Sequence, residues 1–170
     1  MILTIGHSTH AMDEFIGMLA AHGVEAIADV RTIPRSRHNP QFNRETLPAC
    51  LAAAGIEYVH SEGLGGLRHA RRDSVNTGWK NLNFRGFADY MQTPEFAEAL
   101  VRLIERARTH RTAIMCSEAV PWRCHRSLIA DALGVRGIPV EHIMTAASRK
   151  AHTLTPFAKV DGDQMSYTLS

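Results

Sequence analysis

Short apolar runs alternate with amphipathic segments along most of the chain. Residues 2–5 form a continuous apolar run closed by Gly6, and apolar side chains then recur at helical spacing over residues 12–20. Gly23 supplies a stop for this second pattern. The first part of the chain is therefore predicted to fold as strand, loop and helix.

The same order returns further along the chain. We predict further strands at residues 24–30, 56–60, 112–116 and 139–144, and further helices at 47–54, 84–91, 93–107 and 128–133. Two last segments, 154–160 and 165–169, flank the turn signal Asp161-Gly162 and predict a terminal hairpin. Alternating strands and helices predict one α/β domain over residues 1–170. We expect a mainly parallel sheet with helices on both faces, a Rossmann-like three-layer arrangement, and a C-terminal β-hairpin.

Polar and reactive residues follow several of the predicted strands. Ligands of parallel sheets bind beyond the carboxyl ends of the strands. The residues at these ends are His7 and Ser8, Asp29 to Arg31, His60 to Glu62, and Cys116 to Glu118. The sequence thus predicts a functional site at this edge. A long polar stretch at residues 63–84 lacks periodicity, which is typical of a functional or mobile segment.

Composition limits the kind of protein this is. A net charge of +2 and three cysteines describe a mildly basic chain without a disulfide framework, so any anion site must be local. The N-terminus lacks the pattern of a signal peptide, and no apolar run approaches the ~20 residues that span a bilayer. We expect a cytoplasmic protein without membrane association. Neither a cofactor nor an oligomeric state is indicated.

Cys116 and Cys124 are the most reactive residue types at the predicted edge. Cys124 stands between Arg123 and His125 near a helix start, an environment that favours the thiolate. We expect Cys124 to be the nucleophile or redox thiol, with Cys116 as its resolving partner. Glu118 or His7 would then carry the proton, and His125 would lie near the reacting centre. Alternatively, both cysteines are buried packing residues.

The spacing of this segment excludes two familiar sites. A tyrosine-phosphatase loop needs cysteine, five residues and then arginine, but position 122 is Trp and Arg123 comes one residue late. The spacing of Cys116, Cys124 and His125 matches no usual zinc pattern, so we predict no metal site. A helix start beside Arg123 and Arg126 still favours an anion.

Arginines supply the clearest anion signal. Arg31, Arg35 and Arg37 share one loop after a strand, and Ser8, Asp29 and Arg126 complete the predicted substrate-binding set. For Asp29 we favour a structural role, in which the carboxylate holds a guanidinium group in place. A second basic stretch, residues 68–72, stands near Trp79 and Phe84, a combination that can grip nucleic acid.

Several motifs together resemble a known family. They are Thr4-Ile5-Gly6-His7-Ser8, Asp29-Val30-Arg31 with Pro34-Arg35-Ser36-Arg37, Leu64-Gly65-Gly66, Phe87-Ala88-Asp89-Tyr90-Met91, and Met115-Cys116-Ser117-Glu118 followed by Cys124-His125-Arg126. In this order they resemble the family called domain of unknown function 488, whose pattern usually has alanine where Ser117 stands. The resemblance implies a compact α/β protein of prokaryotic type without a settled activity.

These observations leave three hypotheses. The first is a small enzyme acting on an anionic, phosphate-bearing or nucleic-acid-derived substrate through a thiol and carboxylate site. The second is a nucleic-acid or nucleotide-binding module without catalysis. The third is a metal-binding or redox-sensing protein that uses Cys116, Cys124 and His125.

Overall fold

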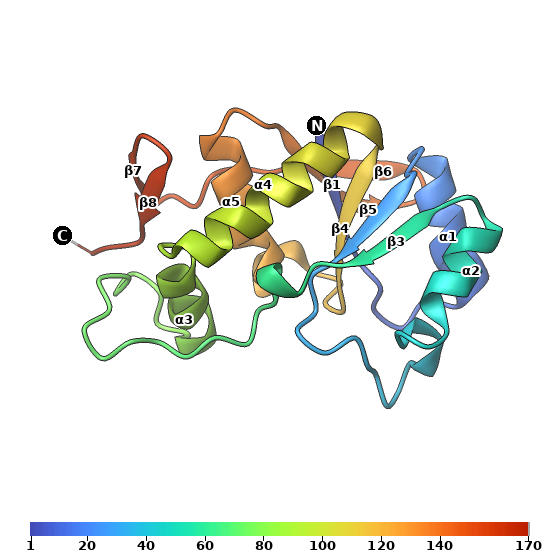
Figure 1. Ribbon diagram of the computed structural model, residues 1–170, viewed down its shortest axis with the longest axis horizontal. Helices are drawn as coiled ribbons and strands as arrows, with labels where there is room; N and C mark the ends of the chain where they lie inside the picture. The colour runs from blue at the N-terminus through green and yellow to red at the C-terminus, as the bar shows by residue number, and fades with distance from the viewer. Residues whose placement is uncertain (170) are drawn as a thin grey trace.

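A six-stranded sheet forms the centre of the molecule, for which the computed structural model describes residues 1–169 (Figure 1). Its strands are β1 (Ile2–Gly6), β2 (Ala26–Asp29), β3 (Glu57–His60), β4 (Thr112–Cys116), β5 (Val140–Thr145) and β6 (Ser148–Ala151). They lie in the order β3-β2-β4-β1-β5-β6, and only β6 runs antiparallel to its neighbour. The predicted mainly parallel sheet is confirmed.

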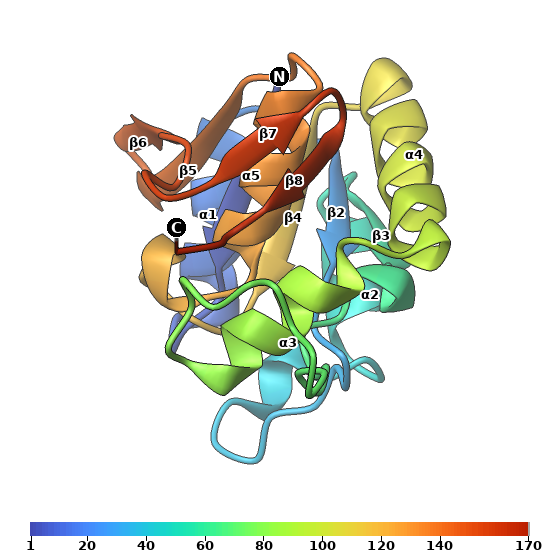
Figure 2. The ribbon, with the colours of Figure 1, turned by 90° about the vertical axis from the view of Figure 1, so that its left-hand side faces the viewer.

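Helices cover both faces of this sheet, as predicted for a three-layer fold. They are α1 (Met12–Ala21), α2 (Leu47–Ala53), α3 (Leu82–Tyr90), α4 (Pro94–Thr109) and α5 (Arg126–Val135), with short 3-10 turns η1 (Pro40–Phe42), η2 (Glu62–Leu64) and η3 (Pro121–Arg123). One buried cluster contains side chains of α1 and α2, and the other contains side chains of α3, α4 and α5. The sheet therefore separates two apolar cores (Figures 1 and 2).

Strands β1 and β4 are neighbours from which the chain leaves in opposite directions. After β1 it passes through α1 to β2 on one side of the sheet, and after β4 it passes through α5 to β5 on the other side. The two helices lie on opposite faces. A crevice opens at such a switch point beyond the carboxyl ends of the strands. Here it lies beside Cys116, at the end of β4.

The C-terminal hairpin is confirmed, although its strands are shorter than predicted: β7 (Lys159–Asp161) pairs with β8 (Gln164–Ser166). The hairpin lies alongside α5 (Figure 2), and Met165 and Tyr167 are buried in the core that α5 helps to form. Strand β6 was not predicted. All four of its residues are exposed and its turn lacks Gly, Pro and Asn, so neither periodicity nor turn chemistry marks it.

The long stretch after η2 is fixed by one buried carboxylate rather than by regular structure. Asp89 of α3 accepts hydrogen bonds from the Arg71 backbone at 2.8 Å, from the Ser74 hydroxyl at 2.5 Å and from the Asn76 amide at 2.7 Å. Asn76 also accepts from the Tyr167 backbone amide at 2.9 Å. The segment is thereby fixed to both α3 and the C-terminal part of the chain. Among residues 1–169, no helix has the length and apolarity needed to cross a bilayer.

Candidate thiol site

Two cysteines and one arginine meet at the carboxyl end of β4. The Cys116 and Cys124 sulfurs lie 2.7 Å apart, with the Cys124 thiol donating to Cys116. The Nη1 atom of Arg126 donates to the Cys116 sulfur at 2.6 Å and also to the Glu118 carbonyl. Arg126 is the first residue of α5, so the start of this helix brings its guanidinium beneath the strand end. The two thiols, whose contact the sequence left open, are thus in contact.

The loop between β4 and α5 closes tightly over the end of β1. A side-chain carbon added to Gly6 would stand 1.8 Å from the Glu118 carbonyl oxygen, so only glycine permits this approach. The backbone amides of His7 and Ser8 donate to the carbonyls of Cys116 and Ser117, which extends the β1–β4 ladder into the loop. Close contact with β1 therefore aims the Glu118 carbonyl at Arg126.

Arg126 is a fully buried cation whose direct partners are neutral groups and a thiol. Besides Cys116 and Glu118, it donates to the Thr4 hydroxyl at 3.2 Å and to the Ala119 carbonyl at 3.1 Å. Within residues 1–169 it forms no ion pair with a carboxylate. A buried charge is stable only when it is compensated. The group in position to compensate it is the Cys116 sulfur.

The two thiols differ in acidity because they differ in their neighbours. Burial alone would raise the pKa of Cys116, but the hydrogen bond from Cys124 and the charge and hydrogen bond of Arg126 outweigh it and lower the pKa to about 7. Burial and the adjacent Cys116 raise the pKa of Cys124 well above its ordinary value. The expectation that Cys124 is the low-pKa thiol is wrong. The helix-start cation that favours a thiolate contacts Cys116 instead.

His125 is fixed by carbonyl groups from two other segments. Its Nε2 atom lies 2.9 Å from the Val30 carbonyl and 3.1 Å from the Leu64 carbonyl, and carbonyls only accept, so this nitrogen carries the proton. The other nitrogen, Nδ1, lies 3.5 Å from the Cys124 sulfur and is free to accept. Burial lowers the pKa of His125 to about 4, so the ring is neutral at pH 7. It contacts the less acidic of the two thiols.

A cavity of about 440 Å³ opens above the two sulfurs. Its lining includes Cys116, Ser117, Glu118, Cys124 and His125, with walls from residues 31–33, 35, 66–67, 81, 83 and 84. Arg35 and Arg123 also line it, and both are exposed with no side-chain hydrogen bond or ion pair inside the described part of the chain. The thiols therefore lie at the floor of a pocket that carries two free cations.

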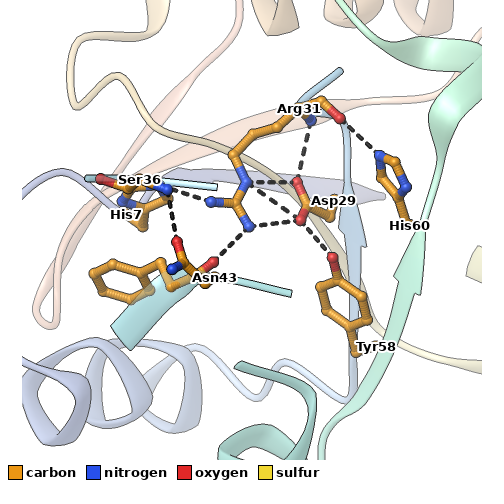
Figure 3. Close-up of polar contacts among 8 residues, drawn as sticks. His7, Asp29, Arg31, Ser36, Asn43, Tyr58 and His60 are labelled. Carbon is orange, nitrogen blue, oxygen red and sulfur yellow. Dashed lines mark hydrogen bonds and ion pairs between the residues drawn. The ribbon is translucent and has the colours of Figure 1, made fainter. Parts of the chain in front are cut away.

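Asp29 and Arg31 form a separate buried group next to this pocket. The guanidinium of Arg31 donates to the Asp29 carboxylate at 2.8 to 3.2 Å and to the Phe42 carbonyl at 2.7 Å, while the Tyr58 hydroxyl donates to the same carboxylate at 2.6 Å. Figure 3 shows Arg31 and Tyr58 converging on Asp29. Burial, together with the Asp29 carboxylate, raises the pKa of Tyr58. Asp29 thus holds a guanidinium in place, the structural role favoured from the sequence.

His7 belongs to this second group rather than to the thiols. Its Nε2 atom accepts from Arg31 at 3.3 Å, its Nδ1 atom donates to the Ser8 carbonyl at 2.9 Å, and its ring stacks on Phe42 (Figure 3). Burial lowers the pKa of His7 to about 4. The ring is therefore neutral and has both nitrogens occupied, which makes it a support for Arg31.

The remaining predicted residues lie around the pocket in different ways. The Glu118 carboxylate accepts from the Val120 amide at 3.1 Å and faces the cavity, while Ser8 is half-buried at a strained backbone position with φ of 47°. Arg37 is exposed and is absent from the cavity lining that the described residues form. The structure thus gathers Arg35, Glu118, Cys116, Cys124 and His125 around one cavity, and leaves Arg37 outside it.

The second basic stretch does not present a combined arginine and aromatic surface. Arg71 pairs with Asp73, and the Arg68 guanidinium lies 3.7 Å from the centre of the Tyr90 ring. Trp79 packs against Phe84, Phe157 and Tyr167. These aromatic rings pack against one another, which leaves less of their surface to stack on bases.

Thr4 is a contributor that sequence reasoning missed. Thr4 is fully buried and its hydroxyl accepts from Arg126. Its presence as the one polar residue inside an apolar strand was the signal that could have marked it as part of the site. Arg123, named from the sequence as a cation at the helix start, lines the cavity. Nowhere in residues 1–169 do three or more His, Cys, Asp or Glu side chains lie together as a metal site would require.

Comparisons with known proteins give one match. A family model described as "Domain of unknown function DUF488" matches residues 11–133, which include both cysteines and the arginine loop. No curated protein matches the chain, and no solved structure matches it.

Proposed function

The chain belongs to the family described as Domain of unknown function DUF488, and from the geometry of its site we propose that it is a dithiol redox protein acting on small anionic disulfides. In this function Cys116 is the attacking thiolate and Cys124 resolves the mixed disulfide. The pocket arginines select the anion. This version retains the thiol chemistry expected from the sequence and exchanges the roles of the two cysteines.

The observation that carries the proposal is the fully buried Arg126, whose guanidinium lies 2.6 Å from the Cys116 sulfur. Without a carboxylate partner among the described residues, it favours the thiolate form of Cys116 as its counter-ion. A thiolate with a pKa of about 7 combines ionisation at neutral pH with good nucleophilicity. A merely packing cysteine needs no such cation.

The second thiol completes a balanced reaction. The Cys116 thiolate attacks one sulfur of a substrate disulfide, forms a mixed disulfide and releases the first substrate half as a thiolate. The Cys124 sulfur, 2.7 Å away, then attacks Cys116 and releases the second half. The Cys124 proton passes to that leaving thiolate or to Nδ1 of His125, at 3.5 Å. The protein becomes the intramolecular disulfide, and the substrate is reduced to two thiols.

Two exposed cations support an anionic substrate. Arg35 and Arg123 line the cavity from different segments, and guanidinium groups bind carboxylates and phosphates through paired donors. Arg31 lines the same cavity, but its charge is already balanced by Asp29. Arg35 and Arg123 are therefore the residues expected to distinguish an anionic disulfide from a neutral one.

The test is the stoichiometry of the reaction with dithiobis(nitrobenzoate), a disulfide that carries two carboxylates. Replacing Cys50, a half-buried thiol of α2, by serine gives a parent protein with only the two site thiols. The parent should release two equivalents of aryl thiolate and retain no adduct. Cys124→Ser should release one equivalent and keep the other half on Cys116, while Cys116→Ser should react slowly.

Two results would contradict the proposal. One is a retained adduct in the parent, which would show that Cys124 does not resolve the mixed disulfide. The other is a Cys116 that reacts no faster than free cysteine at pH 7. For the anion preference, Arg123→Gln should slow the reaction with dithiobis(nitrobenzoate) and leave the reaction with neutral dithiodipyridine unchanged, whereas equal slowing of both would refute charge selection.

A further inference from the structure

A continuous row of polar side chains runs through the buried layer between the sheet and α5. It begins at Arg126, whose Nε donates to the Thr4 hydroxyl at 3.2 Å. Thr4 lies 2.6 Å from Nδ1 of His142, and Nε2 of His142 lies 2.9 Å from Nδ1 of His152. His152 Nε2 lies 2.7 Å from the Asp131 carboxylate. The row starts and ends on α5, five residues apart.

The fold brings these residues together in a regular way. Thr4 and His142 are paired positions of the parallel strands β1 and β5. His152 follows β6, and its backbone amide donates to the Val140 carbonyl of β5. Asp131 projects from the buried face of α5 and also accepts from Tyr167 at 2.8 Å and from Thr155 at 2.6 Å. Three separate segments, α5, residues 152–155 and the chain after β8, thus meet around one buried carboxylate.

One arrangement of protons satisfies every hydrogen bond in the row. A guanidinium only donates, so the Thr4 hydroxyl accepts from Arg126 and gives its own proton to Nδ1 of His142. Nε2 of His142 must then carry the ring proton and donate to His152. His152 in turn donates to Asp131, whose carboxylate only accepts. In this arrangement no member of the row lacks a partner.

We propose that Thr4, His142, His152 and Asp131 act as positioning residues that hold the Arg126 guanidinium against the Cys116 sulfur. None of them touches the sulfurs, so their influence passes through Arg126. Because every member of the row is paired in this arrangement, losing any member leaves its neighbour with an unpaired donor or acceptor inside the core. The inference rests on the proposed function, because it concerns the thiolate that this function uses.

The charged surroundings agree with this arrangement. Burial lowers the pKa of His142 to about 3, and the neighbouring His152, Arg126 and Lys150 act in the same direction, while Asp131 opposes them. Around Cys116 the charged and titratable neighbours are Arg126 and Cys124. His142 therefore stays neutral over the whole range in which Cys116 titrates, so ionisation of His142 cannot confuse a measurement on the thiol.

The experiment is the pH profile of iodoacetamide alkylation at Cys116 in the Cys50→Ser parent under reducing conditions. Tryptic cleavage after Arg123 places Cys116 and Cys124 in separate peptides, so each thiol can be quantified by mass spectrometry. Thr4→Val keeps the shape of the side chain and removes its hydroxyl, while Thr4→Ser keeps the hydroxyl and is the matched control. His152→Gln disrupts the distant end of the row, and His110→Gln, at the end of α4, is the control histidine.

We expect Thr4→Val and His152→Gln each to raise the midpoint for Cys116 by about one pH unit, which lowers the thiolate fraction at pH 7 roughly fivefold. Thr4→Ser and His110→Gln should retain the parent midpoint. Unchanged midpoints in both Thr4→Val and His152→Gln would overturn the inference, as would a shift in Thr4→Val alone. If Thr4→Val fails to fold, His142→Asn provides the same comparison.

This outcome is separable from that of the proposed function. A parent that retains the aryl adduct, yet shows the expected midpoint shifts, would refute the redox role and support the positioning row. A parent that releases two equivalents, but has variants with unchanged midpoints, would support the redox role and refute the row.

Discussion

Ionisation of Cys116 should make the stability of the protein depend on pH in a specific way. The perturbation is Cys116→Ser in the Cys50→Ser parent, because serine occupies a similar volume, still accepts from Arg126 and does not ionise. In the folded protein the pKa of Cys116 is lowered from its ordinary value of 9.0 to about 7. The thiolate therefore stabilises the folded state increasingly as the pH rises from 7 to 9, and this contribution is lost as the pH falls through 7.

The magnitude follows from the difference between the two pKa values. The gap in unfolding free energy between the parent and Cys116→Ser should widen, relative to pH 6, by about 1 kcal/mol at pH 8 and by about 2 kcal/mol at pH 9. The Cys124 thiol, whose pKa is raised, opposes this change only slightly below pH 9, where the unfolded thiol begins to ionise, and it is present in both proteins.

Urea unfolding followed by circular dichroism, with a phosphine reductant present throughout, measures this gap. Both proteins are compared at each pH, so the titration of all other groups cancels to first order. A gap that is constant from pH 6 to pH 9 would refute the assignment of the thiolate to Cys116. A gap that narrows as the pH rises would show that burial outweighs Arg126.

Three further predictions concern the surroundings of the site. Gly6→Ala should lower the unfolding free energy by at least about 2 kcal/mol, because the added carbon meets the Glu118 carbonyl at 1.8 Å. Urea unfolding measures this loss. An unfolding free energy equal to the parent's would show that the loop can move aside. Asp29→Asn should cost about 3–5 kcal/mol by leaving Arg31 buried without its partner, and should lower the pKa of Tyr58, measured by absorbance titration; an unchanged titration would contradict the contact. Three histidines are buried with a lowered pKa: His7, His125 and His142. Because the unfolded chain binds protons that these rings do not, acidification from pH 7 to pH 5 should remove several kcal/mol of stability, and urea midpoints that are equal at both pH values would count against their burial.

The fold was predictable from the sequence because its signals are local. The strand at residues 112–116 is found with the predicted bounds, since its apolar run is delimited by polar neighbours. The start of α4 follows from Thr93, whose hydroxyl accepts from the Phe96 amide, and from Pro94 at the first helical position. Strand β6 carries no such signal, because its pairing with β5 depends on tertiary structure.

The candidate site was predictable in its location and not in its electrostatics. Strand ends placed Cys116 and Glu118 at the correct edge, but sequence proximity suggested that the helix-start cations act on Cys124. At the start of α5, the side chain of Arg126 instead points beneath β4. Its guanidinium contacts the sulfur of Cys116, ten residues earlier in the chain. The role of His142 depends on the register of β1 and β5, which no spacing along the chain reveals.

The depth of the pocket determines which molecules can meet the thiolate. Cys116 is 3% exposed and Cys124 is 7% exposed, and the cavity above them is walled by the arginine loop and by residues 66–67, 81, 83 and 84. A folded surface cannot reach a sulfur at the floor of such a recess. Cross-linking of two copies of the chain through the site is therefore disfavoured. In the proposed function the Cys116 sulfur would therefore meet small compounds, and the half-buried Cys50 is the thiol more open to cross-linking between copies.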